Sequence, residues 1–110
     1  MLIKNKVMNK RIYFSNIEWE KPSVGVKQKI YIKGNKRLRL LKFKDNFIEK
    51  EWCLNGHIGH VIGGEMKIDY NGQIQLYKKG DGIWISKGEQ SKHKVIIEKG
   101  KKSSLCYLNQ

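Results

Sequence analysis

The apolar residues of this 110-residue chain alternate in short runs, and no stretch sustains the spacing of an amphipathic helix. The clearest runs are 29–32, 37–43, 83–85, 95–97 and 105–108. Glycine, asparagine and aspartate separate them, as at Gly34-Asn35 and in the segment 79–82. Short strands with turns at this spacing are typical of a sandwich or barrel, so the sequence predicts an all-β fold.

A β-hairpin is predicted around Asn71-Gly72, because apolar residues alternate on both sides of it. A two-residue loop would pair Tyr70 with Gln73 and put the apolar residues of the two strands on opposite faces. A three-residue loop, 70–72, would pair Asp69 with Gln73 and put them on one face. The residues brought together in this way are Ile68 with Ile74 and Met66 with Leu76. We therefore predict the three-residue loop, with Gly72 in the left-handed position of a type I turn plus bulge.

The length is that of one domain, which we take to be 1–110. Within it, 1–28 is interpreted as an N-terminal strand and a connection, and 29–110 as the core barrel. The N-terminal strand is expected within 11–17, followed by a polar stretch at 18–23. Because small open barrels leave sheet edges to be covered, we expect a homodimer, with 11–17 as the candidate for strand exchange.

The net charge of +13 suggests a polyanion such as nucleic acid as a partner. Only three of the 23 basic residues are arginine, and the lysines are scattered through every segment. Specific phosphate and base contacts favour the arginine fork, so the pattern indicates a solvated lysine surface and argues against nucleic acid.

No apolar run has the length of a membrane helix, and 1–8 has neither the apolar stretch nor the cleavage site of a signal peptide. We therefore expect a soluble, cytoplasmic protein that has no membrane partner. In that reducing compartment Cys53 and Cys106 are expected to be free thiols.

Two segments resemble the paired motifs of the cupin superfamily: Gly56-His-Ile-Gly-His-Val-Ile-Gly-Gly-Glu65 and Lys79-Gly-Asp-Gly-Ile-Trp-Ile-Ser-Lys-Gly88. The spacing of Gly80, Ser86, Gly88 and Ser91 matches the second motif, and a hairpin separates the two segments. The resemblance covers about two-thirds of the chain. It implies a double-stranded β-helix, or jelly-roll barrel.

The metal ligands of cupins, three histidines and a glutamate, are not reproduced. Depending on the interval, the first two histidine positions fall on Lys50 and Trp52 or on Glu51 and Cys53, while His57 takes the place of the glutamate and Ser91 that of the last histidine. A displaced set remains, namely Cys53, His57 and His93, the last being two residues beyond Ser91 and on the same strand face. Three N and S ligands plus water suit zinc or another divalent transition metal. The alternative is that all three are packing or surface residues.

We expect a small-molecule ligand at the barrel mouth. Its candidate binding residues are Trp84, Ser91 and His60, although the parity of His60 places it on the face opposite His57. Trp52, Trp84 and Tyr107 are interpreted as residues that line the barrel or a subunit contact. The alternatives are a metal-dependent cupin enzyme of the oxygenase or isomerase type and a lysine-rich polyanion-binding module. The cupin resemblance fixes no reaction.

Overall fold

The computed structural model describes residues 10–109, which are almost entirely strand and loop. In chain order the elements are η1 (Phe14–Asn16), β1 (Glu20–Ser23), β2 (Val26–Lys33), β3 (Lys36–Phe43), β4 (His57–Tyr70), β5 (Gln73–Lys78), β6 (Gly82–Ile85), η2 (Glu89–Ser91), β7 (Lys94–Ile96) and β8 (Ser103–Asn109). The two η elements are single 3-10 turns. The all-β prediction is confirmed. Within residues 10–109 no helix is long and apolar enough to cross a bilayer.

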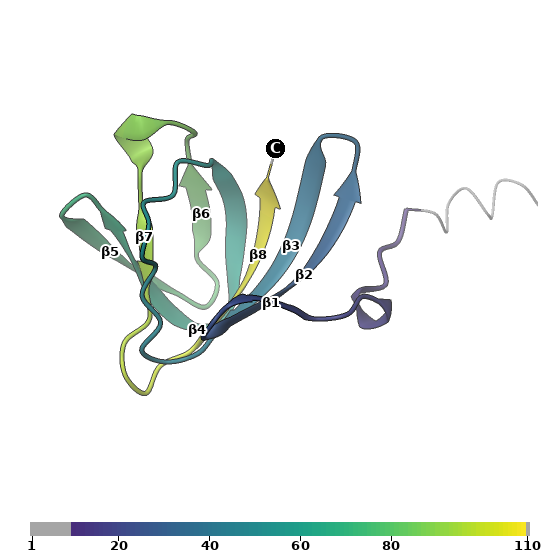
Figure 1. Ribbon diagram of the computed structural model, residues 1–110, viewed down its shortest axis with the longest axis horizontal. Helices are drawn as coiled ribbons and strands as arrows, with labels where there is room; N and C mark the ends of the chain where they lie inside the picture. Colours follow the sequence, from purple (N-terminus) through teal and green to yellow (C-terminus); the bar gives the residue numbers. More distant parts are fainter. Residues whose placement is uncertain (1–9, 110) are drawn as a thin grey trace, which may run out of the picture.

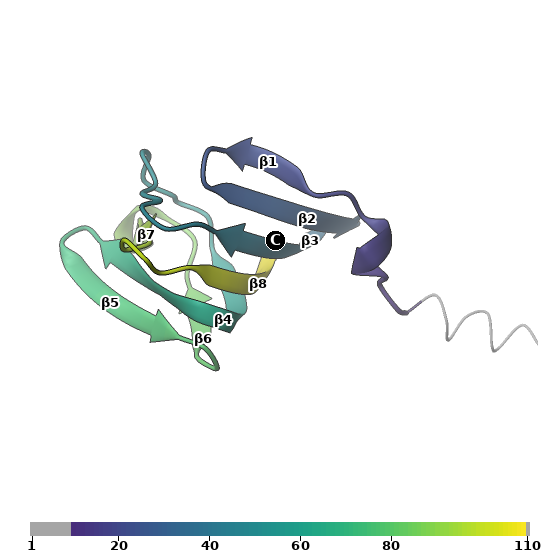
Figure 2. The same ribbon diagram turned by 90° about the horizontal axis from the view of Figure 1, so that it is seen from below.

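One long strand, β4, joins the two sheets of the fold. The strand order is β1-β2-β3-β8-β4-β5, and β6 and β7 also pair with β4. The first half of β4 pairs with β6 and β8, and its second half pairs with β5 and β7. Between Val61 and Gly63 the register with β8 shifts, and such a bulge bends a strand. The sheets consequently curl into a half-barrel, with β1, β2 and β3 on one side and β5 and β7 on the other (Figures 1 and 2).

The core fills the inside of this curl. Strand β8 shows the pattern most clearly, since alternate residues from Ser103 to Asn109 are buried. The buried apolar residues are Val26, Leu41, Phe43, Val61, Met66, Ile68, Tyr77, Ile83, Ile85, Val95, Ile97, Leu105 and Tyr107. Each buried side chain of this size contributes about 1.5–3 kcal/mol relative to exposure. They come from β2 to β8 and form one continuous cluster.

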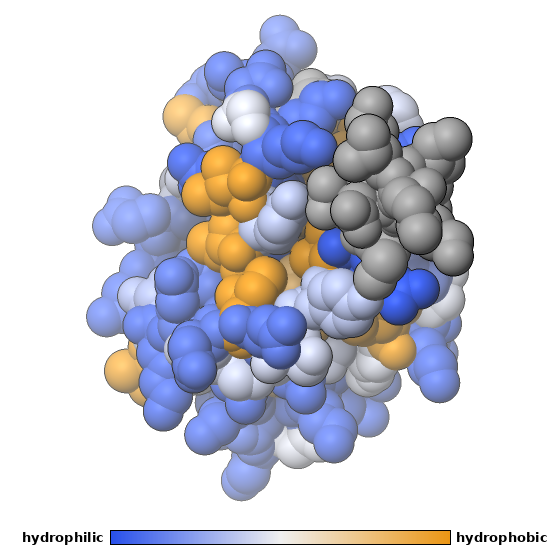
Figure 3. Space-filling model, turned by 90° about the vertical axis from the view of Figure 1, so that its right-hand side faces the viewer, coloured by the Kyte–Doolittle hydropathy of each residue, from blue (hydrophilic) through white to orange (hydrophobic). Residues whose placement is uncertain are grey.

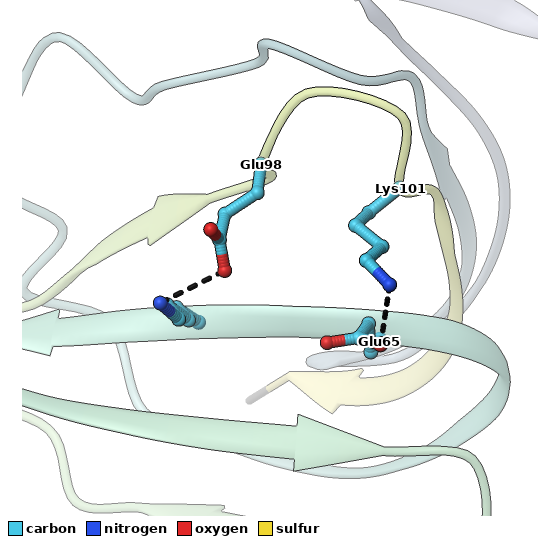
Figure 4. Close-up of polar contacts among 4 residues, drawn as sticks. Glu65, Glu98 and Lys101 are labelled. Carbon is cyan, nitrogen blue, oxygen red and sulfur yellow. Dashed lines mark ion pairs between the residues drawn. The ribbon is translucent and has the colours of Figure 1, made fainter.

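Gly64 allows the chain before β8 to cross closely over β4. A Cβ at this position would overlap the carbonyl of Lys102, and Gly64 has a φ of +69°, so no other residue fits without distortion. Two ion pairs lie beside the crossing: Lys67 with Glu98 at 2.8 Å and Lys101 with Glu65 at 3.4 Å (Figure 4). Exposed pairs contribute little, so the crossing is held mainly by the packing and the backbone.

The β4–β5 hairpin differs from the sequence prediction. Tyr70 pairs with Gln73, so the loop has two residues, Asn71-Gly72, and the predicted three-residue loop is wrong. Both loop residues have positive φ, 56° and 105°, as a type I′ turn requires. This turn matches the twist of the strands. Its register sends Ile74 and Leu76 outward, 58% and 42% exposed, while Tyr77 takes the buried face.

The N-terminal prediction also needs correction. Residues 11–17 contain the turn η1 and no strand, so the predicted strand in that segment is wrong. The first strand is β1, within the stretch interpreted as a polar connection. Pro22 is tolerated there because β1 is an edge strand of its sheet.

Three lysines gather around the ring of Trp19. The Nζ atoms of Lys27, Lys29 and Lys42 lie within 5.4 Å of the centroid of that ring. Figure 3 shows one face on which hydrophilic residues predominate around a strip of apolar ones. An ammonium group over the face of an indole ring makes a cation–π contact.

Candidate metal centre and ligand cavity

Cys53 and His93 are held opposite each other by the backbone. The nitrogen of Cys53 donates to the carbonyl of His93 at 2.8 Å, and the nitrogen of His93 donates to the carbonyl of Cys53 at 3.1 Å. This antiparallel bridge joins the β3–β4 connection to the residue just before β7. Directly opposed residues of such a pair project to the same side of the sheet. The two side chains are therefore brought together by the fold.

His57 reaches the same place from the start of β4. Its side chain is buried and stacks on the ring of Tyr107, with 4.5 Å between the ring centroids and 10° between the planes. The ring of Tyr107 lies over Gly59, where a Cβ would overlap it. The absence of a side chain at Gly59 thus allows Tyr107 to support His57.

The donor atoms of these three residues converge. The side-chain nitrogen and sulfur atoms of Cys53, His57 and His93 lie within 4.8 Å of one another. Cys53 Sγ is 3.6 Å from His57 Nε2. In a tetrahedral zinc site, with Zn–S of about 2.3 Å and Zn–N of about 2.0 Å, neighbouring S and N ligands are about 3.6 Å apart. The three residues predicted as ligands therefore lie close enough together to hold one metal ion.

His93 already has the tautomer that a metal ligand needs. Its Nδ1 lies 3.0 Å from the Ser91 carbonyl, which can only accept, so Nδ1 carries the proton. A neutral His93 then has the lone pair on Nε2. Burial by itself lowers the pKa of His93, but hydrogen bonds to the Cys53 sulfur and the Ser91 carbonyl, with the charges of Cys53 and Glu49, raise it overall. A metal must therefore compete with a proton at His93.

The tautomer of His57 depends on Asn109. The Asn109 amide nitrogen donates to the Gly56 carbonyl at 3.2 Å and to His57 Nδ1, which leaves the histidine proton on Nε2, facing Cys53. Asn109 Oδ1 is buried and has no hydrogen-bond partner among the described residues. If the amide turns over, this oxygen can accept from Nδ1–H and free the Nε2 lone pair. The same turn replaces the hydrogen bond to the Gly56 carbonyl with a contact between two acceptor oxygens, so Asn109 must readjust if His57 coordinates a metal.

The environment of His57 keeps it neutral. Burial lowers its pKa to about 4, and the positive charges of His93 and Arg39 act in the same direction. At neutral pH His57 needs no deprotonation before it can coordinate a metal.

A cavity of about 770 Å³ opens beside the three candidate ligands. The inner faces of β2 and β3 form one wall, and the β3–β4 connection forms another. Apolar side chains, including Leu41, Phe43 and Phe47, line its inner part. Four charged residues also line it: Arg39, Glu49, Lys50 and Glu51. The arrangement can take an organic molecule next to the candidate metal centre.

Comparison with solved structures gives close matches to the whole fold. The polyketide cyclase RemF from Streptomyces resistomycificus superposes with a TM-score of 0.75 and 15% identity, over 90% of this chain and 77% of that one. An RmlC-like cupin from Shewanella frigidimarina has a TM-score of 0.74 and 14% identity, over 89% of this chain and 86% of that one. A Cupin 2 conserved barrel domain protein from Salinispora arenicola has a TM-score of 0.69 and 10% identity, over 90% of this chain and 84% of that one.

This chain has the fold of the cupin superfamily. No protein-family model and no curated protein matches its sequence. The likeness to cupins therefore lies in the fold, as the two motif-like segments indicated, and it assigns no reaction.

The remaining sequence candidates do not lie in the cavity of this cupin fold. Trp84 is on the outer face of β6 and 78% exposed, so the interpretation that it lines the barrel is wrong. His60 is exposed, with Nε2 3.2 Å from the Gly80 carbonyl, on the face opposite His57 as its parity indicates. Ser91 meets the site only through its backbone carbonyl. Tyr107 does line the cavity, as expected, and both cysteines are free.

Sequence reasoning missed three residues of this site: Arg39, Glu49 and Asn109. In 37–43 apolar residues occur on both faces, so the pattern did not show which face points inward or that Arg39 lies on it. Glu49 belongs to an irregular connection without periodicity. For Asn109 a signal existed, since it has the same parity as Leu105 and Tyr107 in the last strand.

Proposed function

We propose that this protein binds a small organic molecule in its barrel cavity, beside a divalent transition metal held by Cys53, His57 and His93. The observation that supports this most strongly is the convergence of three N and S donor atoms within 4.8 Å at the wall of a cavity of about 770 Å³. Packing does not require that two buried histidines and a cysteine direct their polar atoms at one point. A soft thiolate with two imidazoles favours zinc or a similar ion over magnesium or calcium.

The site has the form of an open centre. Three protein ligands leave a position for water or a ligand, whereas structural zinc sites use four protein ligands. In that position a bound metal supplies Lewis acidity and a binding point for an oxygen or nitrogen atom. The chain contributes the rest: Ser91 and Asn109 orient the imidazoles, and Tyr107 supports His57.

A metal-dependent enzyme is a second candidate, and Glu49 is the observation that favours it. Its carboxyl lines the cavity, and burial raises its pKa even though Oε1 accepts a hydrogen bond from the Val95 nitrogen at 2.8 Å. A carboxyl with a raised pKa keeps its proton to a higher pH than an ordinary glutamate, which favours a role as general acid or base. Loss of turnover with retained ligand binding in Glu49→Gln would support the enzyme.

Both proposals assume a reducing compartment such as the cytoplasm. The two cysteines are unpaired in the fold, and a thiol that serves as a metal ligand must stay reduced. The expectation of a homodimer is a separate proposal, which size-exclusion chromatography with light scattering would test.

Metal binding is tested with protein purified without a histidine tag, stripped with a chelator and titrated with cobalt(II). We expect one equivalent to bind, with the thiolate-to-cobalt charge-transfer absorption of a cysteine ligand. Cys53→Ser should abolish that absorption, and His93→Gln should weaken binding at least about tenfold. Cys106→Ser and His60→Asn are the matched controls and should behave as wild type. Less than a tenth of an equivalent bound by the wild type would contradict the proposal.

A further inference from the structure

Arg39 places a positive charge in the cavity without a carboxylate partner. It lies on the inner face of β3, where it pairs with Tyr107 of the neighbouring strand β8. Arg39 takes part in none of the ion pairs formed by residues 10–109. Burial lowers the pKa of Arg39, although the charge of Glu49 acts in the opposite direction. Arginines inside proteins are normally paired with an anion.

A neutral amide holds the guanidinium in place. Both Nε and Nη2 of Arg39 donate to Oε1 of Gln28, at 3.2 and 2.8 Å. Gln28 is buried, and its own amide nitrogen donates to Oε1 of Glu20 at 3.3 Å. Of the five N–H groups of the guanidinium, the other three have no hydrogen-bond partner among residues 10–109 and can meet a ligand. The arginine is thus oriented without being neutralised.

We propose that the cavity recognises organic acids through one carboxylate bound by Arg39, with the apolar body of the acid packed against the inner wall. This inference rests on the proposed function and specifies its ligand class. The planar guanidinium fork matches a carboxylate in geometry. Leu41 and Phe43 follow Arg39 along the same face of β3, so a chain or ring attached to the carboxylate meets apolar surface.

The charge balance of the cavity favours a single carboxylate over a phosphate dianion. Arg39 and Lys50 line the cavity together with Glu49 and Glu51, so there is no excess of positive charge. Its walls are strands and irregular chain, with no helix N-terminus such as phosphate sites use. One oriented guanidinium suffices for a monoanion.

The test uses the full chain, metal-stripped and zinc-loaded, with hexanoate, 1-hexanol and hexylamine as probes in calorimetric titrations. Hexanoate should bind at least tenfold more tightly than hexanol, and hexylamine should bind least. Arg39→Gln should weaken hexanoate binding at least tenfold and leave hexanol binding unchanged. Arg37→Gln, on the same strand but exposed and outside the cavity, is the matched control and should bind like wild type.

A second variant keeps the arginine and removes only its free charge. Gln28→Glu, made together with Glu20→Gln so that the two side chains can still share a hydrogen bond, is nearly isosteric and gives Arg39 an internal carboxylate partner. It should weaken hexanoate binding at least tenfold without disturbing the fold. Equal hexanoate affinity in wild type, Arg39→Gln and this double variant would overturn the inference. Hexanol binding without hexanoate binding would overturn it and leave the proposed function standing. If neither probe binds in either metal state, the cavity is no ligand site and the proposed function fails as well.

Discussion

The amide nitrogen of Asn109 donates a hydrogen bond to Nδ1 of His57. The proton of the neutral imidazole therefore lies on Nε2, the nitrogen that faces Cys53. The two residues come from opposite ends of neighbouring strands, β8 and β4. Without metal the proton lies on Nε2, whereas coordination through Nε2 needs it on Nδ1. In the proposed metal centre, Asn109 would therefore control how readily His57 coordinates the ion.

Asn109→Asp should increase zinc affinity. A carboxylate at this position accepts from Nδ1–H and leaves Nε2 with a free lone pair. A change of this kind raises metal affinity about tenfold. Asn109→Leu, which offers neither donor nor acceptor, should lower affinity by a similar factor. Competition with a chromophoric chelator measures both. Nitrogen NMR of the metal-free protein should show the His57 proton on Nδ1 in the aspartate variant, and equal affinities for all three proteins would contradict the assignment.

The lowered pKa of His57 predicts acid sensitivity of the metal-free protein. In the unfolded chain a histidine takes up a proton near its ordinary pKa of about 6.5, but folded His57 does so only near 4. Between these values the unfolded state binds more protons, so stability falls as the pH falls. From pH 7 to pH 5 this group alone removes about 2 kcal/mol.

His93 acts in the opposite direction, because its raised pKa gives stability that is present at low pH and lost as the pH rises through that pKa. The His57 contribution is therefore isolated by comparing wild type with His57→Gln in urea unfolding at pH 7 and pH 5. On going from pH 7 to pH 5, the free energy of unfolding of wild type should fall by about 2 kcal/mol more than that of His57→Gln. A difference between the two free energies of unfolding that does not change with pH would show that His57 titrates normally.

The sequence predicted the fold and the three candidate ligands for reasons that the structure explains. Gly56 to Ser91 carries turn and strand spacings that are local, and His93 shares a face with Ser91 because parity is fixed within an extended segment. Arg39 and Glu49 were not predicted because their inward position depends on β8 and on the path of an irregular connection. Such contacts are nonlocal, so periodicity carries no signal for them.

The hairpin offers a test of register in which sequence pattern and turn chemistry disagree. Asn-Gly prefers the two-residue type I′ turn, and this preference exposes Ile74 and Leu76 at the edge of the sheet. Ile74→Thr should therefore change the free energy of unfolding by less than about 0.5 kcal/mol. Met66→Ala, which truncates a side chain only 2% exposed, should cost about 2–5 kcal/mol. A cost above about 1.5 kcal/mol for Ile74→Thr in urea unfolding would favour the three-residue loop instead.

Gly59→Ala tests how the aromatic support of the candidate metal centre is built. A Cβ at this position would overlap the Tyr107 ring and lie 2.5 Å from the Cys106 carbonyl, so the strands or the ring must move. We expect a loss of about 3 kcal/mol in the free energy of unfolding and weaker cobalt binding, because the ring that stacks on His57 is displaced.

The matched control for this substitution is Gly63→Ala in the same strand. A Cβ there would meet Ser104 at an ordinary 3.7 Å, so the cost should stay within about 1 kcal/mol. In the double variant Gly59→Ala with Tyr107→Leu, the overlap with the ring is removed. The loss of stability in the double variant should therefore be smaller than the sum of the losses in the two single variants. Strict additivity, or equal costs for Gly59→Ala and Gly63→Ala, would mean that Tyr107 does not depend on the space left by Gly59.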